Sequence, residues 1–241
     1  MGASLGGKQE DGDSKENPSS SPTAARLPES TAADHEQRYT PNLEEDKPWI
    51  DRVRMVGSTA EQHDGNSTTT TPPPRNVGTE HLPVEIFPGL YLGNAACIQN
   101  VDRLRSLNIG GVFNVAGPLA LPSKTIKALR AHEIEYKRIT AQDEEDYPML
   151  NLHWQEFMDH MEAFSNGDQQ KNVVVHCVGG MNRSVLMVTA YYMTKQHVNV
   201  CEAVRHVRSL RGTDALDNQS FQEQLVAFAR VHGLLDQLDE E

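Results

Sequence analysis

A cysteine, an arginine and a serine lie close together in the segment Val173–Ser184. Cys177 follows a β-branched run and His176, and Arg183 and Ser184 come after five intervening residues. A thiolate is a nucleophile, and the guanidinium fork of an arginine can hold two oxygens of a tetrahedral anion. These residues could therefore bind a phosphate ester, attack its phosphorus atom and form a phosphocysteine.

The residues between Cys177 and Arg183 complete an anion-binding loop. Their backbone amides can curl around one phosphate group, and the N-terminus of a following helix adds its positive end. Gly179 and Gly180 would permit the backbone angles and the close approach that this requires. We predict a phosphate-binding set of Val178, Gly179, Gly180, Met181, Asn182 and Arg183.

Two further side chains have predicted roles beside the nucleophile. Ser184 could donate a hydrogen bond to the sulfur of Cys177 and ease its departure in a second chemical step. His176 is expected to hydrogen-bond the backbone of the loop and so shape the site. This chemistry needs no metal or other cofactor, because the guanidinium and the amides offset the phosphate charge.

Other kinds of site fit these residues less well. A lone cysteine is often a small buried hydrophobe, and a Gly-Gly pair is often only a turn. A nucleotide-binding loop would end in Gly-Lys-Ser/Thr, which does not occur here. The three cysteines are far apart and no histidine accompanies them at ligand spacing, which disfavours a zinc site.

The segments around the loop indicate an α/β protein. Short strands are predicted at 84–86, 90–92, 111–115, 134–140 and 173–176, with helices between them. Apolar residues recur at three-four spacing from Leu150 to Phe164, and 185–193 is apolar nearly all round, as in a buried helix. We expect a central mixed sheet flanked by helices, with the C-x5-R phosphate loop between a strand and a buried helix.

Several motifs occur in an order that resembles a known family. They are HCVGGMNRS at 176–184, AYYM at 190–193, PGLYLGN at 88–94 and the N-x2-F-x2-Q-L pattern from Asn218, together with Asn114 and Arg211. In combination they resemble the dual-specificity phosphatases of the cysteine-based protein tyrosine phosphatase superfamily. The resemblance runs from about His81 to Leu238 and implies a protein tyrosine phosphatase-like fold.

The resemblance also implies an acid that works with the cysteine. The family carries an aspartate on a loop that follows a strand, and here the predicted strand 134–140 is followed by 141–146, AQDEED. Asp143 matches the family position, and Asp146 is the alternative. The acid would protonate the leaving group and later deprotonate the attacking water. Glu144 and Glu145 are expected to be solvated turn residues.

The composition predicts one catalytic domain preceded by a tail. Residues 1–80 are rich in Ser, Thr, Pro, Gly and Asn, and include TTTTPPP at 68–74. Such a segment buries too little apolar surface to offset chain entropy, so we expect a disordered acidic tail before a catalytic domain at 81–241. An apolar cluster at Trp49, Ile50, Val53, Met55 and Val56 is expected to be ordinary linker, with docking or packing on the domain as the alternative.

A protein phosphatase acting on phosphotyrosine and on phosphoserine or phosphothreonine is the expected function. The chain lacks extra segments that would deepen the pocket for phosphotyrosine alone. A phosphoinositide or phosphoglucan phosphatase is an alternative, although this loop has no lysine. An RNA 5′-triphosphatase also has Asn before the arginine, as Asn182 is here, but Val185 replaces its glycine. A weakly active module that binds a phosphosite is the last alternative, and the intact Cys177, Arg183 and Asp143 argue against it.

The net charge and the cysteine spacing of the sequence indicate which partners and which compartment to expect. With 22 basic and 34 acidic residues the formal net charge is −12, which disfavours nucleic acid and anionic membrane surfaces as partners. Phosphoprotein substrates are what the family resemblance implies. Widely spaced cysteines suggest a reducing compartment, and we expect a cytoplasmic signalling enzyme.

Gly2 is a candidate for N-myristoylation, although Gly6 stands where the motif prefers Ser or Thr. One acyl chain would give weak, reversible membrane association. Cys97 is a candidate to resolve an oxidised Cys177.

Overall fold

The computed structural model describes residues 38–56, 79–165 and 171–235 of the chain. Its strands are β1 (Val84–Phe87), β2 (Leu90–Asn94), β3 (Ile109–Asn114), β4 (Glu135–Arg138) and β5 (Asn172–Cys177). Its α-helices are α2 (Lys47–Met55), α3 (Ala95–Ile98), α4 (Val101–Ser106), α5 (Ser123–Ala131), α6 (Met149–Ser165), α7 (Arg183–Gln196), α8 (Val200–Arg211) and α9 (Gln219–Val231). Two short 3-10 turns, at Thr79–His81 and Pro118–Ala120, complete the described elements.

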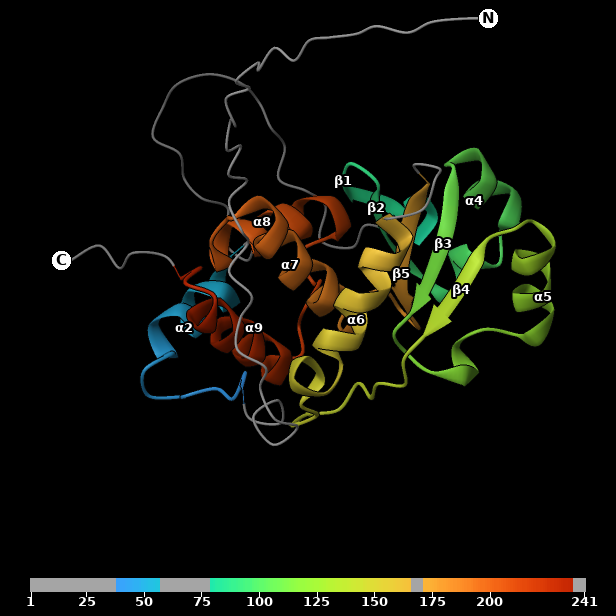
Figure 1. The fold of residues 1–241 in the computed structure, drawn as a ribbon. Coiled ribbons are helices and arrows are strands. Elements are labelled where there is room, and N and C mark those ends of the chain that lie inside the picture. Colours follow the sequence, from blue (N-terminus) through green and yellow to red (C-terminus); the bar gives the residue numbers. More distant parts are fainter. Residues whose placement is uncertain (1–37, 57–78, 166–170, 236–241) are drawn as a thin grey trace, which may run out of the picture. The chain divides into compact units, whose positions relative to one another are not determined.

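The five strands form one mixed sheet in the order β1-β2-β5-β3-β4 (Figure 1). The β1 strand runs antiparallel to β2, and the other neighbours are parallel. The strand that ends in Cys177 therefore lies at the centre, between β2 and β3. Because parallel strands end at the same edge, Asn94, Asn114 and Cys177 finish side by side there. Each strand lies at or next to its predicted range, so the expected α/β fold is confirmed.

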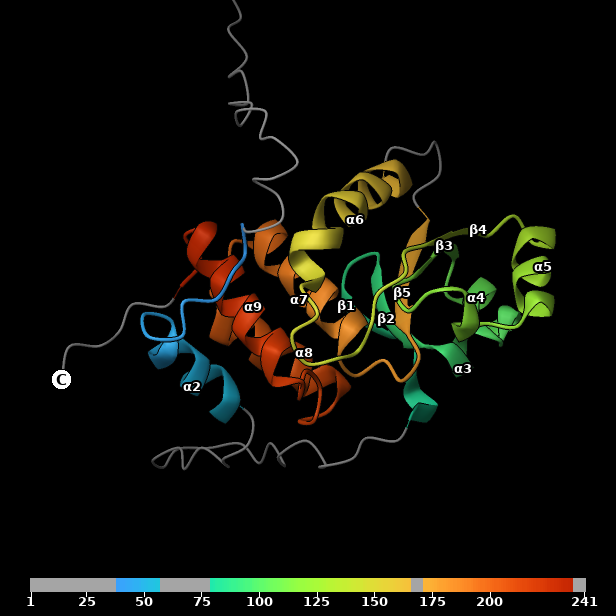
Figure 2. The ribbon, with the colours of Figure 1, turned by 90° about the horizontal axis from the view of Figure 1, so that it is seen from below.

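Helices cover both faces of the sheet, and the strands alternate between the two cores. Val175 of β5 and Phe113 of β3 face the larger core, which α6, α7, α8 and α9 complete. Val174 of β5 and Val112 of β3 face the smaller core beneath α4 and α5. Figure 2 shows the sheet between these two groups of helices. This period of two is what a strand buried on both faces requires.

The helices that frame the phosphate loop begin where the sequence supplies caps. Asn199 Oδ1 accepts a hydrogen bond from the Glu202 amide at 2.7 Å, and Asn218 Oδ1 accepts one from the Phe221 amide at 3.1 Å. Each satisfies an amide that the first helical turn leaves without a partner. The α7 helix is buried from Ser184 to Tyr191, as its uniformly apolar sequence predicts.

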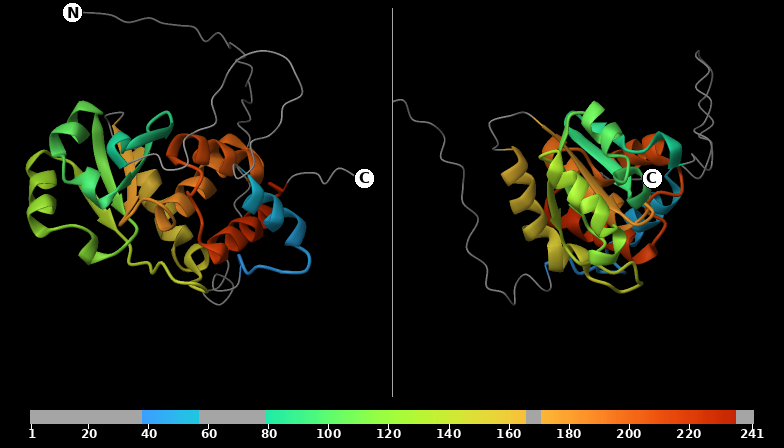
Figure 3. Two further views of the ribbon diagram at one scale, coloured as in Figure 1. Left: turned by 180° about the vertical axis from the view of Figure 1, so that it is seen from behind. Right: turned by 90° about the vertical axis from the view of Figure 1, so that its right-hand side faces the viewer.

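The expectation of plain linker around Trp49 is wrong. Pro48 lies in the first turn of α2, where a missing amide hydrogen costs nothing. Ile50 and Val53 are 3% and 0% exposed and pack in the larger core, and α2 contacts α8 and α9 (Figures 1 and 3). The expected disordered tail 1–80 therefore does not hold for 38–56. The remaining tail segments, 1–37 with Gly2 and 57–78, lie outside the described residues.

Candidate active site

Cys177 is the last residue of the central strand, and its side chain is 1% exposed. Its sulfur accepts a hydrogen bond from the Gly180 amide at 3.2 Å and another from Ser184 Oγ at 3.2 Å. Ser184 is fully buried in the first turn of α7, so its hydroxyl has few alternative partners. Two donors aimed at one sulfur stabilise negative charge on it. The structure thus brings Cys177, Gly180 and Ser184 together as the sequence predicts.

Four carbonyl groups of the phosphate loop, those of residues 178–181, are hydrogen-bonded to groups outside the loop. Val178 accepts from the Ala95 amide at 3.0 Å, and Met181 accepts from the Leu216 amide at 2.7 Å. Arg211 donates to the other two, the carbonyls of Gly179 (3.2 Å) and Gly180 (2.8 Å). In a trans peptide the next amide N–H points the opposite way from the carbonyl. Anchoring these carbonyls outside therefore turns the amides that follow them inward, where the Gly180 amide donates to Cys177 Sγ.

Only one of the two glycines in the loop is required by its geometry. Gly180 has φ +66°, and a Cβ there would lie 2.6 Å from the carbonyl oxygen of Gly93. At Gly179 a Cβ would meet only Met181 Cγ, at an ordinary 3.7 Å. The prediction that both glycines serve the loop is thus supported by sterics at Gly180 alone.

Arg183 and Asp143 come together at the entrance of the loop. Arg183 Nε lies 3.4 Å from Asp143 Oδ2, and Arg183 Nη1 donates to the Ala141 carbonyl at 3.1 Å. The side chain of Arg183 is 11% exposed and that of Asp143 is 31% exposed. Asp146, the alternative acid, is exposed and has φ +68°. Of the two aspartates, Asp143 is the one that forms an ion pair with Arg183.

His176 is enclosed beneath the loop. Its Nδ1 lies 3.0 Å from the Cys177 carbonyl, the kind of backbone contact that the sequence predicts. Desolvation by complete burial lowers the pKa of His176 to about 4, against a smaller opposing effect of that hydrogen bond. The ring is therefore neutral near pH 7, carries its proton on Nδ1 and donates to the carbonyl. Its Nε2 has no hydrogen-bond partner among the described residues.

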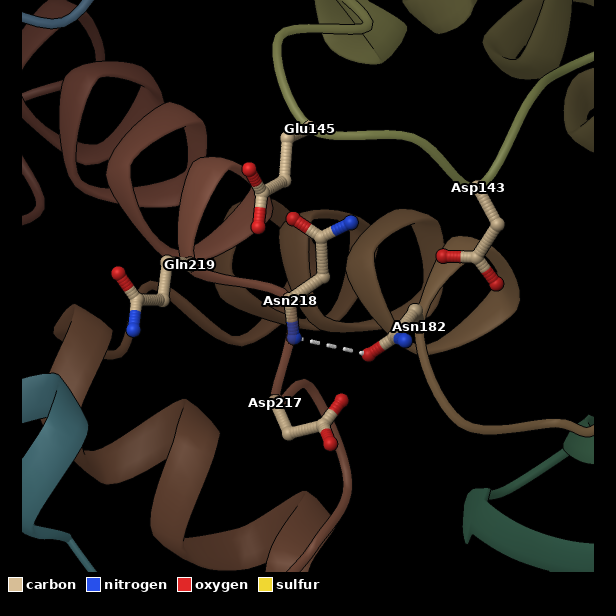
Figure 4. Close-up of a pocket in the computed structure, with 6 residues that line it drawn as sticks. All are labelled: Asp143, Glu145, Asn182, Asp217, Asn218 and Gln219. Carbon is tan, nitrogen blue, oxygen red and sulfur yellow. Dashed lines mark hydrogen bonds between the residues drawn. The ribbon is translucent and has the colours of Figure 1, made fainter.

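Arg211, one of the residues that carry the family resemblance, and the segment after it make contacts to the phosphate loop that the sequence does not predict. Arg211 is 3% exposed, although charged residues usually lie at the surface. Arg211 follows Val204 and Val207 at helical spacing, so the sequence pattern itself indicates that Arg211 lies on the buried face of α8. At the other end of the phosphate loop, Asn182 Oδ1 accepts a hydrogen bond from the Asn218 amide at 3.2 Å (Figure 4). The loop is thus held from α8 and from the start of α9.

A cavity of about 390 Å³ adjoins the loop on the side of Asp143. Its lining residues are Asp143, Glu145, Asn182, Asp217, Asn218 and Gln219. Figure 4 shows the carboxylates of Asp143, Glu145 and Asp217 arranged around it. The cavity therefore offers negative charge and amide groups beside the phosphate loop.

All three cysteines, Cys97, Cys177 and Cys201, are free thiols. Cys97 Sγ donates to the Asn94 carbonyl at 3.1 Å and accepts from the Asn94 amide at 3.3 Å. Within the described residues, no group of three or more His, Cys, Asp and Glu side chains is arranged to hold a metal ion. No described helix combines the length and apolar character needed to cross a bilayer.

Comparison with known proteins agrees with this geometry. The family model described as "Dual specificity phosphatase, catalytic domain" matches residues 90–231. Dual specificity protein phosphatase 1 of Arabidopsis thaliana is 31% identical over 163 residues, which are 68% of this chain and 77% of that protein. Dual specificity protein phosphatase 26 of Homo sapiens is 32% identical over 146 residues, 61% of this chain and 66% of that protein.

A solved structure gives the same result at the level of the fold. The crystal structure of DUSP15 matches with a TM-score of 0.51 and 27% identity, covering 62% of this chain and 90% of that chain. The chain therefore belongs to the dual-specificity phosphatase family and carries the catalytic domain of a dual-specificity protein phosphatase.

Proposed function

We propose that the chain hydrolyses phosphotyrosine and phosphoserine or phosphothreonine in proteins through a phosphocysteine intermediate. The observation that carries this proposal is the pair of hydrogen bonds on Cys177 Sγ, from the Gly180 amide and from Ser184 Oγ. They place two donors on the proposed nucleophile, at the base of a loop whose entrance holds Arg183 and Asp143. A nucleophile, a cation and an acid around one phosphate site are what phosphoryl transfer requires.

In the first step the phosphate ester binds to the loop amides and to the guanidinium of Arg183. Cys177 Sγ attacks phosphorus, an S–P bond forms and the bond from phosphorus to the substrate oxygen breaks. The protonated carboxyl of Asp143 gives its proton to that oxygen, so the product leaves as a neutral alcohol or phenol. The negative charge on the phosphoryl oxygens is offset by Arg183 and the amides.

In the second step a water molecule replaces the departed product. The carboxylate of Asp143 takes a proton from this water, whose oxygen attacks phosphorus. The S–P bond breaks and the electron pair returns to sulfur, where the hydroxyl of Ser184 stabilises the thiolate. One water is consumed, inorganic phosphate is released, and the enzyme returns to its starting state.

The surroundings of the loop favour a protein substrate over polyanionic ones. Among the loop side chains, Val178 is 54% exposed, and the loop contains no lysine. The carboxylates of Glu145 and Asp217 border the adjoining cavity. Several like charges near the entrance repel inositol polyphosphates and RNA 5′-triphosphate ends more than a peptide with one phosphate.

Trapping the intermediate tests the mechanism. The full-length protein is mixed with a phosphotyrosine peptide, quenched in acid and digested, and we expect the mass of one phosphoryl group on the peptide that contains Cys177. Cys177→Ser should lose about 10³-fold or more in turnover yet still bind phosphate. Arg183→Lys should also be severely impaired, because a point charge cannot replace the planar fork. Turnover that persists in Cys177→Ser would contradict the proposal.

Substrate class is tested with the same preparation. We expect phosphotyrosine and phosphothreonine peptides to be hydrolysed faster than a phosphoinositide or an RNA with a 5′-triphosphate. If only the phosphoinositide is hydrolysed, the protein-phosphatase proposal fails while the phosphocysteine mechanism can still hold.

We further propose a cytoplasmic location with at most a small membrane-associated pool through an acyl chain on Gly2. Its motive is the start of the sequence, MGAS, together with the marginal membrane affinity of one myristoyl chain. Mass spectrometry of the mature N-terminal peptide decides the matter, since an N-terminus without an acyl chain removes the membrane pool.

A further inference from the structure

The α2 helix lies outside the matched family domain, 90–231, yet it is joined to that domain at both of its ends. At its start, Asp46 is fully buried and its Oδ1 lies 3.0 Å from Arg230 Nε of α9. Arg230 Nη2 also donates to Asp46 Oδ2 at 3.2 Å. At its other end, α2 is held by Arg208 of α8. The N-terminal segment is therefore a strap over α8 and α9.

Arg208 is the residue that connects the strap to the rest of the domain. It is 5% exposed and donates to four backbone carbonyls. Two belong to the end of the strap, Val53 at 2.7 Å and Val56 at 2.5 Å. The other two belong to the segment after α8, Ala215 at 3.0 Å and Leu216 at 3.4 Å. The carbonyls in the last turn of a helix lack partners within the helix, and a cation is favoured at a helix C-terminus.

The segment that Arg208 holds also holds the phosphate loop. Leu216 donates its amide to the Met181 carbonyl at 2.7 Å, one of the four outward-facing carbonyls of the loop. Leu216 has φ +64°, a left-handed conformation that an L-residue other than glycine keeps only when its surroundings fix it. Its carbonyl is fixed by Arg208 and by Gln222 Nε2, the latter at 2.7 Å. Its side chain is 1% exposed.

These contacts form a continuous path from the strap to the phosphate site. Arg208 fixes Leu216, Leu216 fixes the Met181 carbonyl, and the orientation of that peptide sets where the Asn182 amide points. Losing Arg208 would remove the attachment at the C-terminal end of the strap and, at the same time, one of the two hydrogen bonds on the Leu216 carbonyl. The hydrogen bond from the Leu216 amide to the Met181 carbonyl would then be less firmly positioned, without any change to Cys177 or Arg183.

We propose that Arg208 is a positioning residue for the phosphate loop, and that docking of α2 through Arg208 is needed for full phosphate affinity. The turnover part of this proposal rests on the phosphatase function proposed above, whereas the affinity part does not. Arg208 touches neither the phosphate nor the reacting atoms. It acts through the backbone of Leu216.

The test compares single variants of the full-length protein. Arg208→Met removes every donor at nearly the same length, and Arg205→Met is the matched control, since Arg205 is exposed on the same helix. The measurements are the inhibition constant of orthovanadate, kcat and KM for an aryl phosphate, and the thermal midpoint. All kinetic data are taken well below the midpoint of each variant.

For Arg208→Met we expect the orthovanadate constant and KM to rise roughly tenfold, the scale expected when a site is misplaced through its supporting residues. Arg205→Met should match the wild type. Arg208→Lys should recover part of the loss, because an ammonium can serve some of the four carbonyls. A purely structural residue would lower the thermal midpoint and leave the orthovanadate constant unchanged. That result for Arg208→Met would overturn the proposal.

A second pair of variants loosens the strap from its other side. Ile50→Ala combined with Val53→Ala removes buried contacts of α2 while leaving α8 intact, and it replaces Arg208→Met if that variant does not fold. We expect the orthovanadate constant to rise in the same direction, and an unchanged constant would overturn the role of the strap. Wild-type protein that binds orthovanadate but has no turnover would instead contradict the proposed function and leave the affinity comparison valid.

Discussion

Nε of Arg183 lies 3.4 Å from Oδ2 of Asp143, so the cation of the phosphate loop and the aspartate of a separate loop form an ion pair across the entrance. Both side chains are partly shielded from water, which strengthens the attraction compared with a surface pair. A phosphate that enters must take over the guanidinium from Asp143. In the mechanism proposed above, that exchange would free the carboxyl of Asp143 to reach the leaving oxygen and would tie substrate binding to the availability of the acid.

We predict that Asp143→Ala slows turnover of an alkyl phosphate by about 10²–10⁴, the usual contribution of a positioned acid. The loss should be smaller for an aryl phosphate with a good leaving group, because that oxygen needs less protonation. Steady-state kinetics over a series of leaving groups measures the difference. Asp146→Ala is the matched control on the same loop and should retain most activity. The reverse result would show that the register of the acid loop has been assigned incorrectly.

Gly180→Ala should damage the phosphate site, while Gly179→Ala should be tolerated. A methyl group at Gly180 would lie 2.6 Å from a backbone oxygen that cannot move cheaply, at φ +66°. Such a conformation costs roughly 1–3 kcal/mol for a non-glycine residue, before the clash is counted. Titration with orthovanadate and urea unfolding compare the two variants. If the two variants have equal orthovanadate affinity and equal stability, the contact between Gly180 and the Gly93 carbonyl does not require glycine, and the prediction fails.

The stability of the folded state should fall as the pH drops from about 6.5 towards 4. Burial lowers the pKa of His176 from 6.5 to about 4, so between these values the unfolded chain binds a proton that the folded protein does not. The free energy of unfolding is therefore about 3 kcal/mol higher above pH 6.5 than below pH 4 because of His176 alone. His176→Asn, which retains an N–H donor and does not titrate, should show a flatter dependence in urea unfolding at a series of pH values. If the free energy of unfolding of His176→Asn depends on pH as steeply as that of the wild type, other groups cause the dependence.

Peroxide should inactivate the enzyme reversibly, and Cys97→Ser should recover as fully as the wild type. Burial raises the pKa of the Cys97 thiol to about 11, so little thiolate exists near neutral pH to attack a sulfenic acid on Cys177. Activity after peroxide and then after added thiol gives the comparison. If Cys97→Ser fails to recover, Cys97 resolves the oxidised Cys177 despite its high pKa.

Local patterns in the sequence predict much of this fold. The strand that ends in Cys177 is a continuous β-branched run, which is typical of a strand buried on both faces, and this pattern can be seen without tertiary information. The caps at Asn199 and Asn218 are likewise local, because each side chain bonds an amide three residues on. The order of the strands in the sheet and the pairing of Arg183 with Asp143 join segments far apart in the chain, and no local pattern contains them.

What the sequence interpretation missed depends on partners supplied by the fold. The apolar residues of α2 form a cluster too short to fold alone, and Ile50 becomes buried only because α8 and α9 lie beside it. Arg208 and Arg211 are charged, so composition places them at the surface. Their burial follows from the backbone carbonyls that surround them.

The positions of two strands in the sheet predict that the segments carrying Cys177 and Asp143 differ in their resistance to local unfolding. Cys177 belongs to the central strand, whose residues from Val173 onward are buried, whereas the loop of Asp143 follows β4, an edge strand in which no residue is buried. Amide hydrogens of β4 should therefore exchange with deuterium much earlier than those of β5. Under heating or mild denaturant the loop of Asp143 should therefore loosen first, and phosphate binding should outlast turnover.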